Sequence, residues 1–200
     1  SFATLKSQAK AAGLTTSSFA KSLKDAALQA VGLNSVYDIF QKAVEVGKKM
    51  YQNVVEIDTA MTNLYKVTDE TSERYNRFMS NSATSAKEIG RSVSSLINQS
   101  ADWAKLGYSI DEAEQLAKVS SVYANVGEVG DDTAVSDLVT AMKAFNSEAS
   151  DAITIVDALN ELGNNFATSA ANLGDGLSRS ASSMKLAGTS ANETLAMLTG

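Results

Sequence analysis

The pattern Gly-x-Ser-x-x-Glu occurs twice in this chain, and each copy predicts where one helix stops and the next starts. The glycine can take the left-handed conformation that closes a helix. The serine can cap the following helix, and the glutamate three residues later completes a capping box. Since the 200 residues include no proline, which breaks helices most strongly, the two joints predict a chain of helices with short turns. The joint residues are Gly107, Ser109 and Glu112 in the first copy, and Gly188, Ser190 and Glu193 in the second.

A longer similarity surrounds these joints, because residues 82–116 resemble residues 166–198. The first parts align at an offset of 84 residues, and the second parts, which contain the joints, align at an offset of 81. In this alignment Ser85 and Ser169 are both predicted to cap a helix, and Phe166 is predicted to pack into the core. We interpret the similarity as an internal duplication. The alternative is that capped helices imitate a repeat because they share the same capping residues.

Residues 35–68 predict one long helix, because apolar residues recur at alternating spacings of four and three. The residues beside this stripe are apolar as well, so the apolar face is wide. A wide face favours a bundle, or an oligomer of three or more copies, over a two-stranded coiled coil. We therefore expect a self-association surface here. Its candidate contact residues are Phe40, Met50, Val54, Ile57, Met61 and Leu64.

The composition excludes several kinds of active site. The chain has no histidine and no cysteine, so a histidine-dependent triad, an imidazole zinc site and a disulfide framework are impossible. A hydrolase built on carboxylates such as Glu112 and Asp132 stays open as a hypothesis. We expect instead that residues 125–132 are a loop with Asp132 capping the next helix. No catalytic residue, cofactor or metal site is predicted, and the only tryptophan, Trp103, is expected to anchor a helix end in the core.

The predicted fold class is all-α, with a long N-terminal helix followed by a multi-helix bundle. Residues 1–34 are expected to form a short helical segment, residues 35–81 the long amphipathic helix, and residues 82–200 a module of about six helices. The chain starts with Ser and stops within an amphipathic pattern, so we expect it to be an excerpt of a longer protein. No apolar run is long enough to suggest a membrane-spanning helix.

Charge is distributed unevenly along the chain. Residues 1–106 hold 13 Lys/Arg and 10 Asp/Glu, a net charge of +3, whereas residues 107–200 hold 4 and 13, a net charge of −9. Since contacts with phosphates need cations, direct binding of nucleic acid is not expected in the second half.

The order and spacing of several stretches between residues 55 and 200 resemble the core region of tail tape measure proteins, which come from long-tailed bacteriophages and phage-tail-like bacteriocins. The stretches are GYSIDEAEQLAK, YANVGEV, LVTAMKAFNSEASDAITIVDALNELGNNFATSAANLGDGLSRSAS and AGTSANETLAML, preceded by MTNLYKVTDETSERYNRFM. The resemblance implies a structural virion protein rather than an enzyme.

The resemblance further implies a place in the tail lumen or at the tail tip, after assembly in the host cytoplasm. Such a protein sets tail length, contacts tail tube and tail-tip or baseplate hub proteins, and leaves ahead of the DNA during ejection, when it can contact a membrane. The alternative function is a secreted helical effector or pore-forming protein, because these use similar helices rich in Ala and Ser.

Overall fold

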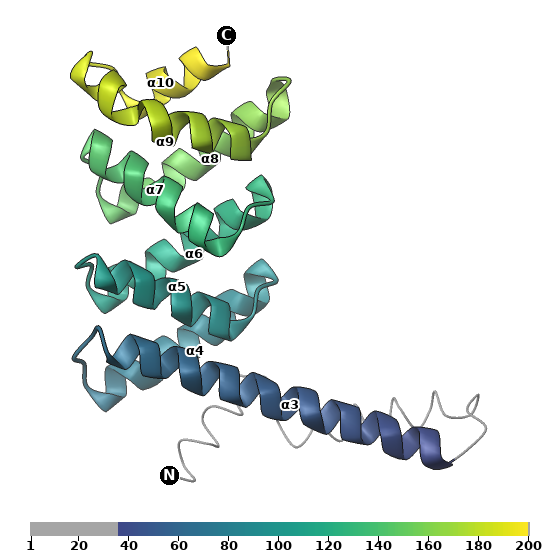
Figure 1. The fold of residues 1–200 in the computed structure, drawn as a ribbon. Coiled ribbons are helices and arrows are strands. Elements are labelled where there is room, and N and C mark those ends of the chain that lie inside the picture. The colour runs from purple at the N-terminus through teal and green to yellow at the C-terminus, as the bar shows by residue number, and fades with distance from the viewer. Residues whose placement is uncertain (1–35, 200) are drawn as a thin grey trace.

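The computed structural model describes residues 36–199, with side chains from Val44 onward, and in this part of the chain every regular element is helical (Figure 1). The all-α prediction is confirmed. The helical segment predicted over residues 1–34 lies outside the described residues. The helices are α3 (Val36–Tyr65), α4 (Ser72–Ile89), α5 (Val93–Lys105), α6 (Ile110–Gly127), α7 (Asp131–Phe145), the short 3₁₀ helix η2 (Ala149–Asp151), α8 (Ala152–Asn165), α9 (Ala170–Leu186) and α10 (Ala191–Leu198).

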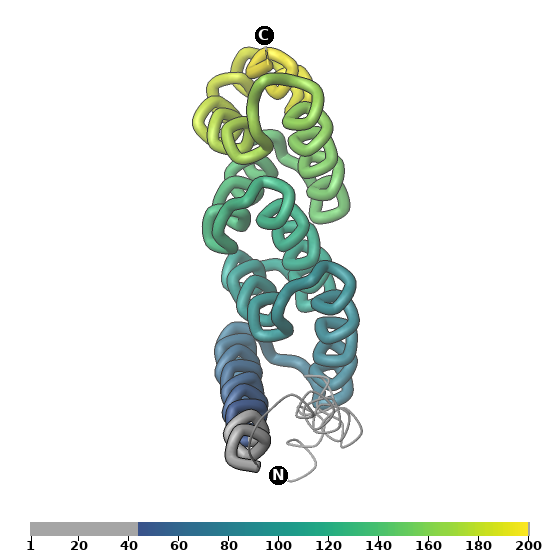
Figure 2. The backbone as a smooth tube through the Cα atoms, turned by 90° about the vertical axis from the view of Figure 1, so that its right-hand side faces the viewer, coloured from purple at the N-terminus to yellow at the C-terminus, as the bar shows by residue number. Residues whose placement is uncertain are grey.

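The helices form an elongated stack of two layers (Figures 1 and 2). One layer contains α3, α5, α7 and α9, and the other contains α4, α6, α8 and α10. Within each layer a helix packs on the next one of the same layer, and helices that follow each other along the chain from α4 onward pack across the layers. This is the layout of an α-solenoid, in which each helix pair contacts only its neighbours.

Two apolar clusters hold the stack together. The larger cluster extends from α5 to α10 and includes Trp103, which is fully buried as the sequence predicted. The smaller cluster joins α3 and α4 to α5 and the start of α6. Because the apolar faces cover neighbours on two sides, most central helices bury residues around more than one stripe. The stack is therefore a series of helix–helix interfaces and has no single centre.

The joints explain half of the similarity between residues 82–116 and 166–198. The turn from α5 to α6 and the turn from α9 to α10 lie at the same edge of the stack, two helix pairs apart (Figure 1). Gly107 and Gly188 have positive φ angles of 96° and 86° there, as the sequence requires of a glycine that ends a helix. The offset of 81 residues thus corresponds to two helix pairs.

The other half of the alignment is wrong about local structure. Ser85 does not cap a helix, because α4 runs from Ser72 to Ile89 and Ser85 is buried in its interior. The cap of this helix is Thr71, whose side chain accepts a hydrogen bond from the Arg74 N–H. The duplication itself therefore stays a prediction. Phe166 is also misjudged, since its side chain is 49% exposed at the turn between α8 and α9.

Candidate functional site

Helix α3 carries the predicted contact residues, and the structure divides it into two halves. It has 30 residues, whereas the other helices of its layer, α5, α7 and α9, have 13, 15 and 17. The second half of α3 lies against α5, and the first half projects beyond the end of the stack (Figure 1). We call this first half, residues 36–54, the overhang.

The second half of α3 is used within the chain. Ile57, Met61 and Leu64 are each no more than 3% exposed. They pack with residues of α4, α5 and α6, including Phe78, Ile97 and Ile110. The structure therefore leaves these three residues no exposed surface for a partner, and the predicted self-association surface is reduced to the overhang.

The overhang presents apolar side chains that the described residues leave largely uncovered. Tyr51 is 72% exposed and Val44 is 36% exposed, while Met50 and Val54 are half-buried. Phe40 belongs to the same helix, but its side chain lies outside the described residues. At Gly47 a β-carbon would have no atom within 4 Å. The overhang is thus a candidate interaction surface.

A groove of about 500 Å³ lies at the base of the overhang, between α3 and the first turns of α5 and α7. Four carboxylates line it: Glu56, Asp102, Asp131 and Asp132. Within residues 44–199, however, no group of three or more acidic side chains is placed to hold a metal ion. Asp132 also does not cap α7, as the sequence suggested, because the cap is Gly130 and Asp132 belongs to the first turn.

The two carboxylates of the hydrolase hypothesis are far apart. Glu112 starts α6 and Asp132 starts α7, so the whole of α6 lies between them, which is about 27 Å for its 18 residues. Glu112 is committed to its capping box, where it accepts hydrogen bonds from Ser109 Oγ at 2.6 Å and Ser109 N at 2.9 Å. These hydrogen bonds lower the pKa of the Glu112 carboxyl, which suits a structural cap and not a general acid.

The second joint repeats this arrangement. Ser190 caps α10, and Glu193 accepts hydrogen bonds from Ser190 N and Oγ, both at 2.8 Å. The same contacts lower the pKa of Glu193. Ser169 caps α9 through a hydrogen bond from the Asn172 N–H at 3.1 Å, without a full box. The structure places all the predicted joint residues at helix ends, and none of them lines the groove.

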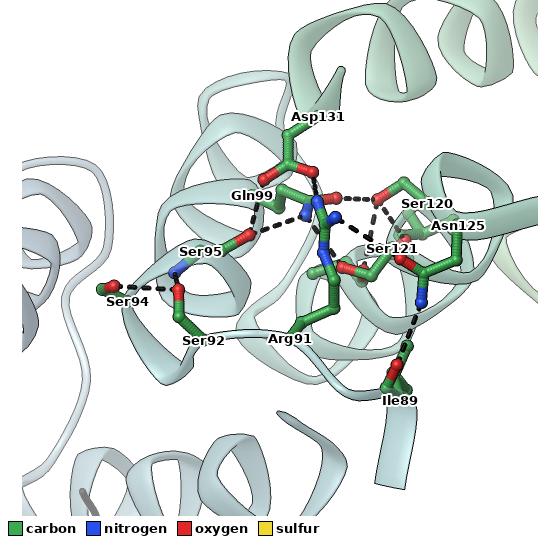
Figure 3. A network of polar contacts seen from close by, with 12 residues as sticks. Ile89, Arg91, Ser92, Ser94, Ser95, Gln99, Ser120, Ser121, Asn125 and Asp131 are labelled. Carbon is green, nitrogen blue, oxygen red and sulfur yellow. Dashed lines mark hydrogen bonds and ion pairs between the residues drawn. The ribbon is translucent and has the colours of Figure 1, made fainter. Parts of the chain in front are cut away.

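A buried polar network, which the sequence analysis missed, connects α5 to α6 (Figure 3). Gln99 is 2% exposed and donates a hydrogen bond to Ser121 Oγ at 2.8 Å. Its carbonyl oxygen accepts one from Ser120 Oγ at 2.6 Å, and Trp103 Nε1 donates to the same hydroxyl at 3.3 Å. Polar side chains on otherwise apolar helix faces were the available signal. Because every one of these groups has a partner, the network fixes how α5 packs on α6.

The network continues to the next helix pair. Gln99 Nε2 also approaches Ser95 Oγ, and Ser95 donates a hydrogen bond to Asp131 Oδ2 at 2.5 Å. Asp131 forms an ion pair with Arg91, which lies in the turn after α4. Figure 3 shows these side chains converging from three helices and one turn. Four consecutive helices, α4 to α7, are therefore linked by polar contacts at one edge of the stack.

A second buried contact joins α6, α7 and α9. Tyr123 is fully buried, and its hydroxyl donates a hydrogen bond to Asp137 Oδ2 at 3.0 Å. Burial, together with the nearby carboxylates, raises the pKa of Tyr123, and burial raises the pKa of Asp137. The Tyr123 ring lies directly against the backbone of α9 at Gly174. This contact is structural, because the tyrosine is closed off from solvent.

The described residues therefore offer a surface for association and no constellation typical of catalysis. None of the described helices is both long and apolar enough to span a membrane.

Comparison with known families gives one match: a family model described as phage-related minor tail protein covers residues 79–200, which is more than half of the chain. This family is structural and not typically enzymatic, and the match supports a role in the tail of a phage particle. No solved structure matches the chain significantly.

Proposed function

Because this chain belongs to the family of phage-related minor tail proteins, we propose that it is a segment of a tail tape measure protein. In this role it sets the length of the tail and contacts tail tube and tail-tip proteins from within the tail lumen. It acts through helix–helix contacts and not through catalysis. The observation that carries the proposal is the family match, together with the order and spacing of the stretches that resemble tape measure proteins.

The layout of the stack supports this role. Each helix pair adds one level, and α3 and α10 lie at opposite ends (Figure 1). The physical length of such a chain grows in proportion to the number of residues, whether the pairs stay stacked or open into continuous helix at about 1.5 Å per residue. Proportional length is the property that a molecular ruler needs.

The proposed partners follow from the surfaces and the charge. The overhang of α3 is the proposed contact with further copies of the chain. The net charge of −9 over residues 107–200 would keep the segment from adhering to the DNA that follows it out of the tail. Membrane contact is proposed only for the moment of ejection.

The secreted effector or pore-forming alternative receives no support from the family match. A leakage assay with lipid vesicles tests it, because a pore-forming chain releases a trapped dye and a tail segment does not.

The localisation is tested by mass spectrometry on purified phage particles before and after DNA ejection. The proposal predicts peptides of this chain in intact tails and their loss from emptied tails. Peptides that remain in equal amount after ejection would contradict a luminal position, and a chain missing from intact tails would contradict the proposed function.

A further inference from the structure

The overhang contains a glycine that the single chain does not explain. Gly47 lies in the middle of α3, where glycine destabilises a helix by about 1 kcal/mol relative to alanine. No atom of the described chain would obstruct a β-carbon at this position, so packing within these residues does not require glycine. Gly47 falls on the apolar stripe, one helical turn after Ala43. Two small residues in succession allow another helix backbone to approach closely at this point.

Helix α5 determines how a second overhang can lie on this stripe. Ser94 of α5 contacts Glu56 of α3, and Asn98 contacts Asn63, so α5 starts near residue 56 and runs in the same direction as α3. It covers the stripe from Ile57 onward. A second α3 that ran parallel to the first, stripe against stripe and in register, would continue into the space that α5 fills. Parallel pairing of the two stripes is therefore blocked by each copy's own α5.

An antiparallel partner avoids this obstacle. If residue i of one copy lies opposite residue 90 − i of the other, all six stripe positions from 36 to 54 stay in register and residue 36 stops opposite residue 54, before α5 begins. In this register Ala43 lies opposite Gly47 of the second copy on both sides of the centre. The larger residues Phe40 and Met50 lie opposite each other further out.

The flanks of this contact are uncharged. Val44 lies opposite Val46 of the second copy, and Ile39 lies opposite Tyr51, whose 72% exposed ring would be covered. Lys48, Lys49 and Glu45 lie on the outward face of the helix, and Lys49 and Glu45 form an ion pair there at 2.8 Å. The surface is thus self-complementary and continues the interface that α3 already makes with α5.

We propose that two copies of this chain pair through the overhangs of their α3 helices, in antiparallel orientation, with the closest approach at Ala43 and Gly47. This inference rests on the self-association proposed above and adds the orientation, the register and the contact residues. The two stacks then point away from the contact in opposite directions.

The first experiment measures the mass of the chain in solution by light scattering over a dilution series, for the natural chain and for two variants. Gly47→Leu places a large side chain at the closest approach, and we expect the dissociation constant to rise about a hundredfold. Gln52→Leu places the same side chain on the outward face and is the matched control, with an unchanged dissociation constant. Circular dichroism verifies that both variants keep their helical content.

The second experiment uses the natural lack of cysteine, which makes introduced thiols the only ones in the chain. Ala43→Cys and Gly47→Cys chains are oxidised separately and as a mixture. The antiparallel register predicts a disulfide between the two different variants in the mixture and none within either variant alone. Disulfides within each single variant would show parallel pairing and overturn the inference.

The outcomes separate this inference from the proposed function. If the natural chain dimerises and Gly47→Leu dimerises equally well, the overhang contact is refuted while self-association stands. If the natural chain stays monomeric up to high concentration, the overhang contact and the proposed self-association are both refuted, and the tail localisation is decided by the mass spectrometry described above.

Discussion

The contact between Tyr123 and Gly174 allows a sharp prediction about stability. A β-carbon added at Gly174 would overlap the Tyr123 hydroxyl and lie 2.8 Å from its Cζ, which is closer than real side chains come. The ring cannot move away freely, since Tyr123 is fully buried and bonded to Asp137. Gly174→Ala therefore forces either the ring or α9 to shift.

The expected magnitude combines three effects. Crowding in a packed interior costs about 1–3 kcal/mol, and loss of the hydrogen bond from Tyr123 to the Asp137 carboxylate costs about 1.5–3 kcal/mol. The higher helix propensity of alanine offsets about 1 kcal/mol. We expect Gly174→Ala to lower the free energy of unfolding by about 2–4 kcal/mol in a urea titration.

Gly176, two residues further along the same helix, provides the control. A β-carbon there would meet only the end of the Leu198 side chain, at 3.2 Å, and this side chain is 39% exposed and can turn aside. Gly176→Ala should therefore leave the free energy of unfolding unchanged or raise it by up to about 1 kcal/mol. Equal stability of Gly174→Ala and Gly176→Ala would refute the assigned packing of α6 on α9.

Two further predictions concern the network and the joints. Gln99→Leu leaves the buried Ser121 hydroxyl without its Gln99 donor and should lower the free energy of unfolding by about 2 kcal/mol, whereas the exposed Gln115→Leu on α6 should change it by less than about 0.5 kcal/mol; equal effects would contradict the network. Glu112 has a lowered pKa in the folded state, so its ionised cap stabilises the fold above the pKa of the unfolded chain, and this contribution is lost as the pH falls through the folded pKa. The stability difference between the natural chain and Glu112→Gln should therefore shrink between pH 6 and pH 3 in thermal denaturation scans, and a difference that grows on acidification would contradict the capping box.

The sequence predicted the local structure well where the signal is chemical. Ser109 with Glu112 and Ser190 with Glu193 specify helix starts through hydrogen bonds that only a few residues can make, and Gly107 and Gly188 specify helix ends. The same reasoning failed at Ser85, because serine in the interior of a helix is chemically identical to serine at a cap. Only the neighbours in space, which bury Ser85 against the stack, distinguish the two situations.

The layout of the helices and the free surface depended on contacts that are distant in the sequence. The stripe of α3 continues without a break from Met50 to Leu64, so periodicity alone could not show that α5 covers Ile57, Met61 and Leu64 while the overhang stays open. Similarly, Gln99 looked like a surface residue of α5, since its partners Ser120 and Ser121 lie about twenty residues away in α6.

The proposed role as a molecular ruler is tested most directly by the tail length of phage that carry an altered number of helix pairs. Removal of residues 91–130 joins the end of α4 to the start of α7 and deletes the 40 residues of one level, α5 with α6. Electron microscopy should then show tails shortened by about 60 Å, at about 1.5 Å per residue, and tails lengthened by the same amount when these residues are duplicated. Tails of unchanged length in both variants would contradict the account.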